Sequence, residues 1–231
     1  MDSEALLWGD QPAPRRGPKP LLNRGRIVRA GIEIADAEGL DALSMQRVAA
    51  KLDAATMSLY RHVPGKTELV ALMLDAAVGE PPEPPRGVGW RTALAAWARG
   101  TRDVFVHHPW TLPLVTGQRT MGPNELAWTE AALRAASATG LPTAALLDVL
   151  ILVNGYVRGA AVDLAGGPVV PGPETLRRLG LLERYPLFAG VLAQATEPEG
   201  PATREYRFEF GLARVLDGVG QFVRTHRGLP S

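Results

Sequence analysis

The sequence predicts an all-α protein made of two helical domains, and three observations lead to that prediction. Apolar residues recur at helical spacing along most of the chain, alanine and leucine are abundant, and no segment shows the period of two typical of a strand. The chain has 25 glycines and 20 prolines, and 13 of these prolines together with eight of the glycines fall in four short stretches. These stretches predict breaks between helices at residues 9–20, 80–89, 166–173 and 197–201.

The breaks divide the 231 residues into an arm, two domains and a linker. Residues 1–20 are expected to be a flexible basic arm, and 80–89 a proline-rich linker. The smaller helical domain occupies 21–79 and the larger one 90–231. No run approaches the ~18 charge-free apolar residues of a membrane helix, so we expect a soluble cytoplasmic protein without membrane contact.

The first helix of the smaller domain has a recognisable start and end. Asn23 is a suitable N-cap, and Gly39 suits the left-handed position that ends a helix. An apolar stripe between these two residues predicts the buried face of the helix. The stripe consists of Ile27, Ala30, Gly31, Ile34 and Ala35.

Ser44 is the expected N-cap of a second, short helix from Met45 to about Leu52. Leu43 and Val48 stand at the two positions of a hydrophobic staple around this cap.

A tight connection at residues 53–55 leads to a third helix, from Thr56 to about His62, and a fourth runs from Lys66 to about Val78. Two short helices joined by a three-residue turn predict a helix-turn-helix.

The larger domain is expected to contain four main helices. They lie at 90–107, about 124–139, about 142–165 and about 203–225, with a short apolar helix or turn at 110–117. Leu146 to Val153 is apolar nearly all round, which predicts burial on several sides of that helix.

Residues 44–70, SMQRVAAKLDAATMSLYRHVPGKTELV, resemble the DNA-binding segment of the tetracycline-repressor (TetR) family of bacterial transcriptional regulators. The resemblance is specific over roughly 21–79. It implies a homodimeric repressor with a palindromic DNA operator and a small-molecule effector bound in the second domain. It also implies a four-helix dimer interface made by the helices at about 142–165 and 203–225.

The recognition helix of a helix-turn-helix shows its first residues to base edges in the major groove. Leu59 and Val63 fall on the opposite, core-facing side of the predicted helix. Hydroxyl groups can bond a base edge or a phosphate, a methionine can contact a thymine methyl, and longer side chains can reach the backbone. The candidates are Thr56, Met57, Ser58, Tyr60 and His62, followed by Lys66 for a phosphate.

The resemblance adds Met45 and Gln46, at the start of the second helix, as DNA contacts. Tyr60 is alternatively a core aromatic, His62 a helix cap and Ser58 an incidental surface residue.

The chain departs from the family pattern at Asp53, where glycine is usual, and at Ala55, where serine or threonine caps the recognition helix. Thr56 can take over that cap by starting the helix one residue later.

The arm contains Arg15 and Arg16 within a Gly- and Pro-rich stretch that resembles a minor-groove hook. A solvated linker without specific contacts is the other interpretation. The charge distribution bears on the same question. Residues 11–66 contain ten basic and five acidic residues, a net charge of +5, whereas the rest of the chain carries −4.

A ligand cavity in the larger domain should be apolar and lined by large side chains. The candidates are Trp97, Phe105, Trp110, Leu114, Met121, Trp128 and Tyr156, each of which is alternatively an ordinary core residue. His107 and His108 point about 100° apart on a helix, so they do not form one metal site. With four histidines and no cysteine, we expect no metal and no cofactor.

Three functions therefore compete. The first is a ligand-responsive repressor, the second a DNA-binding protein of the same fold with a protein trigger or none, and the third an all-α enzyme. No G-x-S-x-G, H-E-x-x-H, P-loop or dinucleotide fingerprint supports the enzyme. An effector that lowers affinity for DNA would favour the first over the second.

Overall fold

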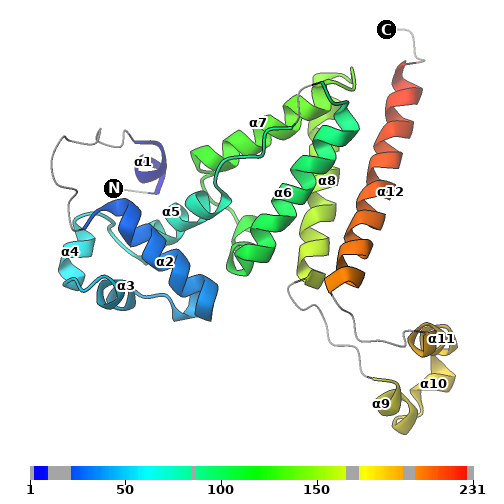
Figure 1. Ribbon diagram of the computed structural model, residues 1–231, viewed down its shortest axis with the longest axis horizontal. Coiled ribbons are helices and arrows are strands. Elements are labelled where there is room, and N and C mark those ends of the chain that lie inside the picture. Colours follow the sequence, from blue (N-terminus) through cyan, green and yellow to red (C-terminus); the bar gives the residue numbers. More distant parts are fainter. Residues whose placement is uncertain (1–2, 10–21, 85–86, 165–171, 195–200, 228–231) are drawn as a thin grey trace.

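The computed structural model describes residues 3–9, 22–84, 87–164, 172–194 and 201–227, and all regular structure in these ranges is helical (Figure 1). The smaller domain contains α2 (Arg24–Glu38), η1 (Leu40–Ala42), α3 (Met45–Lys51), α4 (Thr56–Tyr60) and α5 (Lys66–Val78). The larger domain contains α6 (Trp90–His107), η2 (Pro109–Thr111), η3 (Leu114–Thr116), α7 (Pro123–Ser137), α8 (Thr143–Leu164) and α12 (Pro201–Arg227). Two short 3₁₀ turns, η2 and η3, thus replace the single element expected at 110–117.

Helix α2 begins as predicted but ends differently. The Asn23 side chain accepts a hydrogen bond from the amide of Arg26 at 2.9 Å. Gly39 has φ +83° and ψ 166°, so it is not left-handed helical. The backbone at Gly39 is instead extended, and the chain continues directly into the 3₁₀ turn η1. The positive φ at this position favours glycine.

The turn between α3 and α4 depends on Asp53. This residue has φ +50°, the only positive φ of a non-glycine residue in the described ranges. Ala55 is the N-cap of α4 and supplies no side-chain hydrogen bond, so Thr56 does not take over the cap. Helix α4 ends at Tyr60, earlier than predicted. On α3, the cap is confirmed, because Ser44 Oγ accepts the Arg47 amide at 3.2 Å.

The two domains share part of their packing. Apolar side chains of α2 to α5 form one core, and Trp110 of η2 is buried in that core. Gly31 allows α2 and α5 to approach closely, because a β-carbon there would lie 2.6 Å from Met73 Sδ.

The second core joins α6, α7, α8 and α12. Three ion pairs also connect α6 to α12: Arg91–Asp217, Arg99–Glu209 and Arg102–Glu205.

Two helical segments were not predicted. Helix α1 (Ser3–Trp8) packs on α5, with Leu6 buried, so these residues are not part of a flexible arm. The indole N–H of Trp8 donates to the carbonyl of Met121 at 3.0 Å. Four apolar residues are too few for a signal segment, but they suffice to bury one face of a short helix.

The second unpredicted segment comprises α9 (Pro173–Arg178), α10 (Leu181–Arg184) and α11 (Pro186–Gln194). It projects away from the rest of the described chain (Figure 1). Several of its apolar side chains are exposed, including Leu187 and Val191. Helix α8 is also apolar and largely exposed, since residues 143–163 have a mean hydropathy of 1.6 and only a third of that stretch is buried. Helix α8 is thus long and apolar enough to cross a membrane by length and composition alone.

Candidate DNA-binding surface and ligand cavity

The side chains of α4 divide into a buried and an exposed face. Leu59 and Val63 are fully buried, whereas Met57 is 74% and Tyr60 41% exposed. This exposure excludes the core-aromatic interpretation of Tyr60. The predicted candidates Thr56, Ser58 and His62 are partly exposed, and Ser58 Oγ accepts a hydrogen bond from Arg61 at 3.3 Å.

The first turns of α3 and α5 each expose one further predicted candidate. Gln46 and Lys66 are exposed, and Lys66 opens α5 after the N-cap glycine. Met45 requires a correction, because its side chain is only 4% exposed and belongs to the domain core. The first turn of α3 directs it inward together with Val48, so it presents no side chain to DNA. Arg15 and Arg16 lie outside the described residues.

A cavity of about 740 Å³ is lined mainly by the larger domain, through α6, α7, α8 and the segment after η2, and also by Val78 at the end of α5. Four of the predicted residues, Trp97, Phe105, Met121 and Trp128, are on its wall. The two indole rings meet edge to face, with centroids 6.3 Å apart. Trp97 Nε1 donates to the Trp128 carbonyl and Trp128 Nε1 to the Gly79 carbonyl, both at 2.9 Å, so both rings are held in place.

The other three predicted ligand residues lie elsewhere. Trp110 is buried against the smaller domain, and its indole N–H donates to Asp36 Oδ1 at 2.7 Å. Leu114 packs against the same core. Tyr156 instead joins α8 to α12, because its hydroxyl donates to the Phe208 carbonyl at 2.7 Å. Apolar character alone does not separate residues that face a cavity from those that fill an interface.

Sequence reasoning missed the polar part of the wall. Thr101, Asn154 and Arg158 line the cavity, as do Arg119 and Glu125. Arg119 forms a bidentate ion pair with Glu125. One signal was available, because Arg158 is the single basic residue in the predominantly apolar segment 143–164.

His107 and His108 do not share a site. His107 Nδ1 lies 2.7 Å from the Asp103 carbonyl oxygen, and His108 Nδ1 lies 2.7 Å from Asp36 Oδ1. They end α6 as the sequence predicts. Within the described ranges, no group of three or more histidine, aspartate or glutamate side chains is placed to hold a metal ion.

Comparison with known proteins assigns both domains to one family. Residues 27–73 match the family model described as bacterial regulatory proteins, tetR family, and residues 81–223 match the tetracyclin repressor-like C-terminal domain. The chain belongs to the TetR family. This result confirms the resemblance of residues 21–79 and extends it to the larger domain.

Individual TetR-family proteins agree with this assignment. The HTH-type transcriptional repressor DrrR1 of Streptomyces coeruleorubidus is 41% identical, over 96% of this chain and 86% of its own length. The structure of apo ActR from Streptomyces coelicolor superposes with a TM-score of 0.72 at 26% identity, covering 90% of this chain and all of that one. ActR in complex with actinorhodin gives a TM-score of 0.66 at 25% identity, covering 92% of this chain and all of that one.

In this TetR-family chain, α5 is bonded directly to the cavity wall. Asp75, near the end of α5, accepts the amide N–H of Asn124 at 2.9 Å and that of Glu125 at 3.4 Å. These are the second and third residues of α7, whose own N-cap is Gly122. A carboxylate of the smaller domain therefore caps a helix of the larger one.

The environment of Asp75 explains its electrostatics. Burial, the largest influence, raises the pKa of the Asp75 carboxyl, and the amides of Asn124 and Glu125 oppose that increase by bonding the charged form. The Asp75 carbonyl also accepts from Asn124 Nδ2 at 2.9 Å. Since Glu125 lines the cavity and pairs with Arg119, a short chain of polar contacts links the cavity wall to α5.

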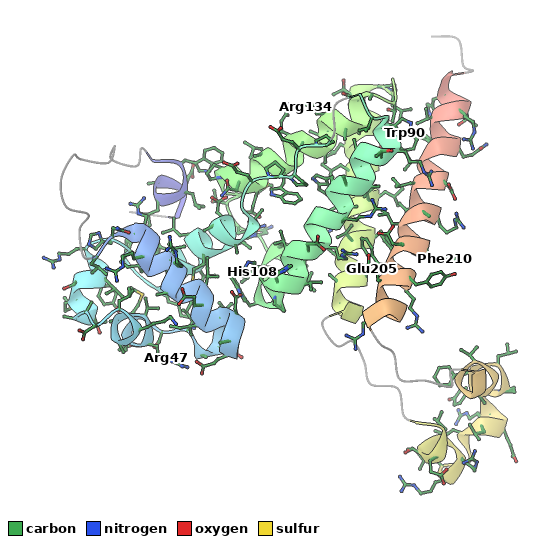
Figure 2. The ribbon with its side chains drawn as sticks, in the orientation of Figure 1. Arg47, Trp90, His108, Arg134, Glu205 and Phe210 are labelled. Carbon is green, nitrogen blue, oxygen red and sulfur yellow. The ribbon has the colours of Figure 1, made fainter. Side chains whose placement is uncertain are left out.

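A second junction lies at the end of α6. Asp36 of α2 accepts hydrogen bonds from Trp110 Nε1, and His108 Nδ1 lies at the same oxygen atom. Figure 2 shows His108 beside α2, at the boundary between the domains. The smaller domain is thus held to the larger one at two places, through α2 and through α5.

Proposed function

We propose that this chain is a homodimeric transcriptional repressor that binds a palindromic operator and releases it when a small molecule occupies the cavity. One observation carries the proposal. The domain that exposes Met57 and Tyr60 on its recognition helix is bonded, through Asp75, to the wall of an apolar cavity. As a DNA-binding regulator the protein acts in the cytoplasm, without a membrane partner and without enzymatic activity.

The exposed residues have distinct roles in this proposal. Thr56 and Ser58 bond base edges, and Met57 contacts a thymine methyl. The DNA backbone is contacted by Tyr60, His62, Gln46 and Lys66. These contacts position the helix without reading the base sequence. Arg15 and Arg16 enter the adjacent minor groove.

Dimerisation is supported by the apolar residues that one chain leaves uncovered. Ile151 of α8 is 58% exposed, and Phe210 of α12, labelled in Figure 2, is 54% exposed. Two such faces related by a two-fold axis would bury one another in a four-helix arrangement. In this proposal the apolar half of α8 packs against the partner chain, which accounts for its length and hydropathy.

Release from DNA is a shift between two dimer states. The operator-bound state places two recognition helices ~34–36 Å apart, and the effector favours a state with a different separation. The hydrogen bonds of Asp75 and Asp36 join the two domains, so a displacement of the larger domain on effector binding also moves the smaller domain. The complex of ActR with actinorhodin supports a small molecule as the effector in this chain.

The proposal is tested by selecting bound duplexes from a random DNA pool with the purified protein. We expect an inverted repeat, bound by one dimer, whose affinity falls when a small molecule from a screen binds the cavity. Enrichment of no sequence would contradict repression by operator binding. Operator binding that no cavity ligand weakens would favour a DNA-binding protein with another trigger.

A further inference from the structure

A half-buried arginine on the cavity wall has no partner among the described residues. Arg158 lies on α8 and faces the cavity, and neither a hydrogen bond nor an ion pair joins it to another described residue. Arg119 on the same wall differs, because its guanidinium is paired in bidentate fashion with Glu125. Glu125 therefore balances the positive charge of Arg119, whereas no described residue pairs with Arg158.

The surroundings of Arg158 add a second polar group. Asn154 precedes it by one helical turn, so both side chains lie on the same face of α8 and both line the cavity. Asn154 likewise has no hydrogen-bond partner in the described part of the chain. The hydroxyl groups of Thr101 and Thr129, in contrast, donate to the carbonyls of Trp97 and Glu125 at 3.0 Å.

The apolar part of the wall is aromatic and fixed. Trp97 and Trp128 are anchored by their indole hydrogen bonds, and Phe105 lies on the same wall. Rigid rings of this kind favour a flat aromatic ligand, which gains contact area at little cost in side-chain entropy. A guanidinium group is planar and presents paired donors that match an anionic oxygen group.

From this arrangement we infer that the cavity selects planar aromatic molecules that carry an acidic group, and that Arg158 binds the acid. Asn154 donates a hydrogen bond to the same end of the ligand, and the ring system lies against Trp97 and Phe105. The inference rests on the proposed function and names the chemical class of its effector. The acidic group is a carboxylate or an ionised ring hydroxyl, which offer Arg158 the same anionic oxygen.

The charges on the wall exclude the opposite preference. Glu125 is the one carboxylate among the described wall residues, and it already accepts hydrogen bonds from Arg119 and from the Gly122 amide. A cationic ligand would therefore meet the charge of Arg158 and find no free carboxylate among the described wall residues. A neutral ligand would leave Arg158 partly desolvated without a counter-charge.

The test compares two probes that share one ring system. Anthraquinone-2-carboxylate and anthraquinone-2-carboxamide differ in charge but hardly in shape, and the tryptophans on the wall report binding by fluorescence quenching. We expect the wild-type protein to bind the carboxylate at least tenfold more tightly. The substitution Arg158→Gln should weaken carboxylate binding by about 10- to 100-fold, the range expected for a charge-assisted hydrogen bond, and change amide binding less than about twofold.

Two further variants make the comparison specific. Arg134→Gln removes an exposed arginine that is not on this wall, and it should leave both affinities unchanged. Arg158→Lys keeps the charge but loses the planar donor pair, so it should retain part of the preference for the carboxylate. This variant also provides the comparison if Arg158→Gln does not fold.

Three results would overturn the inference. They are equal binding of the two probes by the wild-type protein, binding of neither probe, and a preference that survives Arg158→Gln. DNA binding, measured on the same preparations, separates this outcome from the proposed function. If the preference depends on Arg158 but the protein selects no DNA sequence, the ligand class stands and repression is rejected. If operator binding is intact but the preference is absent, repression stands and the ligand class is rejected.

Discussion

The carboxylate of Asp75 occupies the space that a side chain at Gly122 would need. A β-carbon at Gly122 would lie 2.1 Å from Asp75 Oδ1, a distance that no relaxed structure contains. The N-cap of α7 is thus divided between two residues from different domains. Gly122 supplies the backbone position, and Asp75 supplies the acceptor that an N-cap side chain would normally provide.

Replacing Gly122 by alanine should break this junction. The new methyl group displaces Asp75, which removes the cap and leaves a buried carboxylate without its amide donors, at a cost of about 2–4 kcal/mol in the free energy of unfolding. Urea denaturation measures the loss. Gly89→Ala is the matched control, because Gly89 is the N-cap of α6 and a β-carbon there meets nothing within 4 Å. Equal losses in the two variants would contradict the shared cap.

The ion pair between Arg99 and Glu209 should make stability depend on pH. Hydrogen bonding to Arg99 lowers the pKa of the Glu209 carboxyl below its ordinary value of 4.5. The stabilisation is therefore complete above about pH 4.5 and is lost as the pH falls through the lowered value. Since the pair is partly exposed, Glu209→Gln should cost about 1 kcal/mol or less at pH 7. Denaturation of both proteins from pH 7 to pH 3 should show this difference shrinking; a constant difference would refute the assignment.

Substitutions on the recognition surface should separate affinity from sequence preference. Tyr60→Ala and Lys66→Ala should weaken binding to all DNA sequences, and loss of the Lys66 phosphate contact should reduce the slope of log affinity against log salt by about 1. Changes at Thr56 or Ser58 should instead alter which bases are selected. Fluorescence anisotropy over a salt series distinguishes the two effects. Wild-type binding by both alanine variants would show that the contacts are assigned incorrectly.

The basic residues between α1 and α2 are best tested without deleting α1. Deletion of residues 1–19 is expected to weaken operator binding and flatten its salt dependence, but it also removes the packing of Leu6. The double substitution Arg15→Ala and Arg16→Ala removes the two charges alone. We expect a lower affinity and a shallower salt slope. Unchanged values of both would favour a solvated linker.

A charge on the exposed face of α8 should prevent dimerisation. Ile151→Glu places a carboxylate in the proposed interface, where it would be buried without a partner. Sedimentation analysis should show a monomer with unchanged helicity and weak operator binding. Asp163→Ala, which alters an exposed residue on the same helix, is the control. A dimer that persists in Ile151→Glu would place the interface elsewhere.

The helices of the smaller domain could be predicted from cap residues and from the helical spacing of apolar residues. Asn23 and Ser44 cap the helices that the sequence indicates, and Leu59 and Val63 are buried because helical spacing fixes their side. Such features depend on residues three or four apart. Met45 shows the limit of a family resemblance, because a position can correspond while its side chain points into the core.

The cavity was harder to predict because its wall comes from segments far apart in the sequence. Trp97 and Trp110 were both predicted to line the cavity, yet Trp97 lines it and Trp110 is bonded to Asp36. The difference arises from the packing of η2 against α2, which no local pattern records. Asp75 was missed for the same reason, since the amide donors that it accepts from belong to Asn124 and Glu125, far along the chain.

Helix α1 has a consequence for how relatives of this protein are compared. Its Trp8 donates to the Met121 carbonyl, and Met121 is part of the cavity wall, so the first turn of the chain helps to position a residue that a ligand would touch. The two segments that match the family models, residues 27–73 and 81–223, both follow α1 in the chain. Alignments restricted to these segments therefore omit a residue that supports the cavity wall. Substitutions at Trp8 and in the loop around Met121 should be inherited together, and proteins that lack α1 must support that loop by other means.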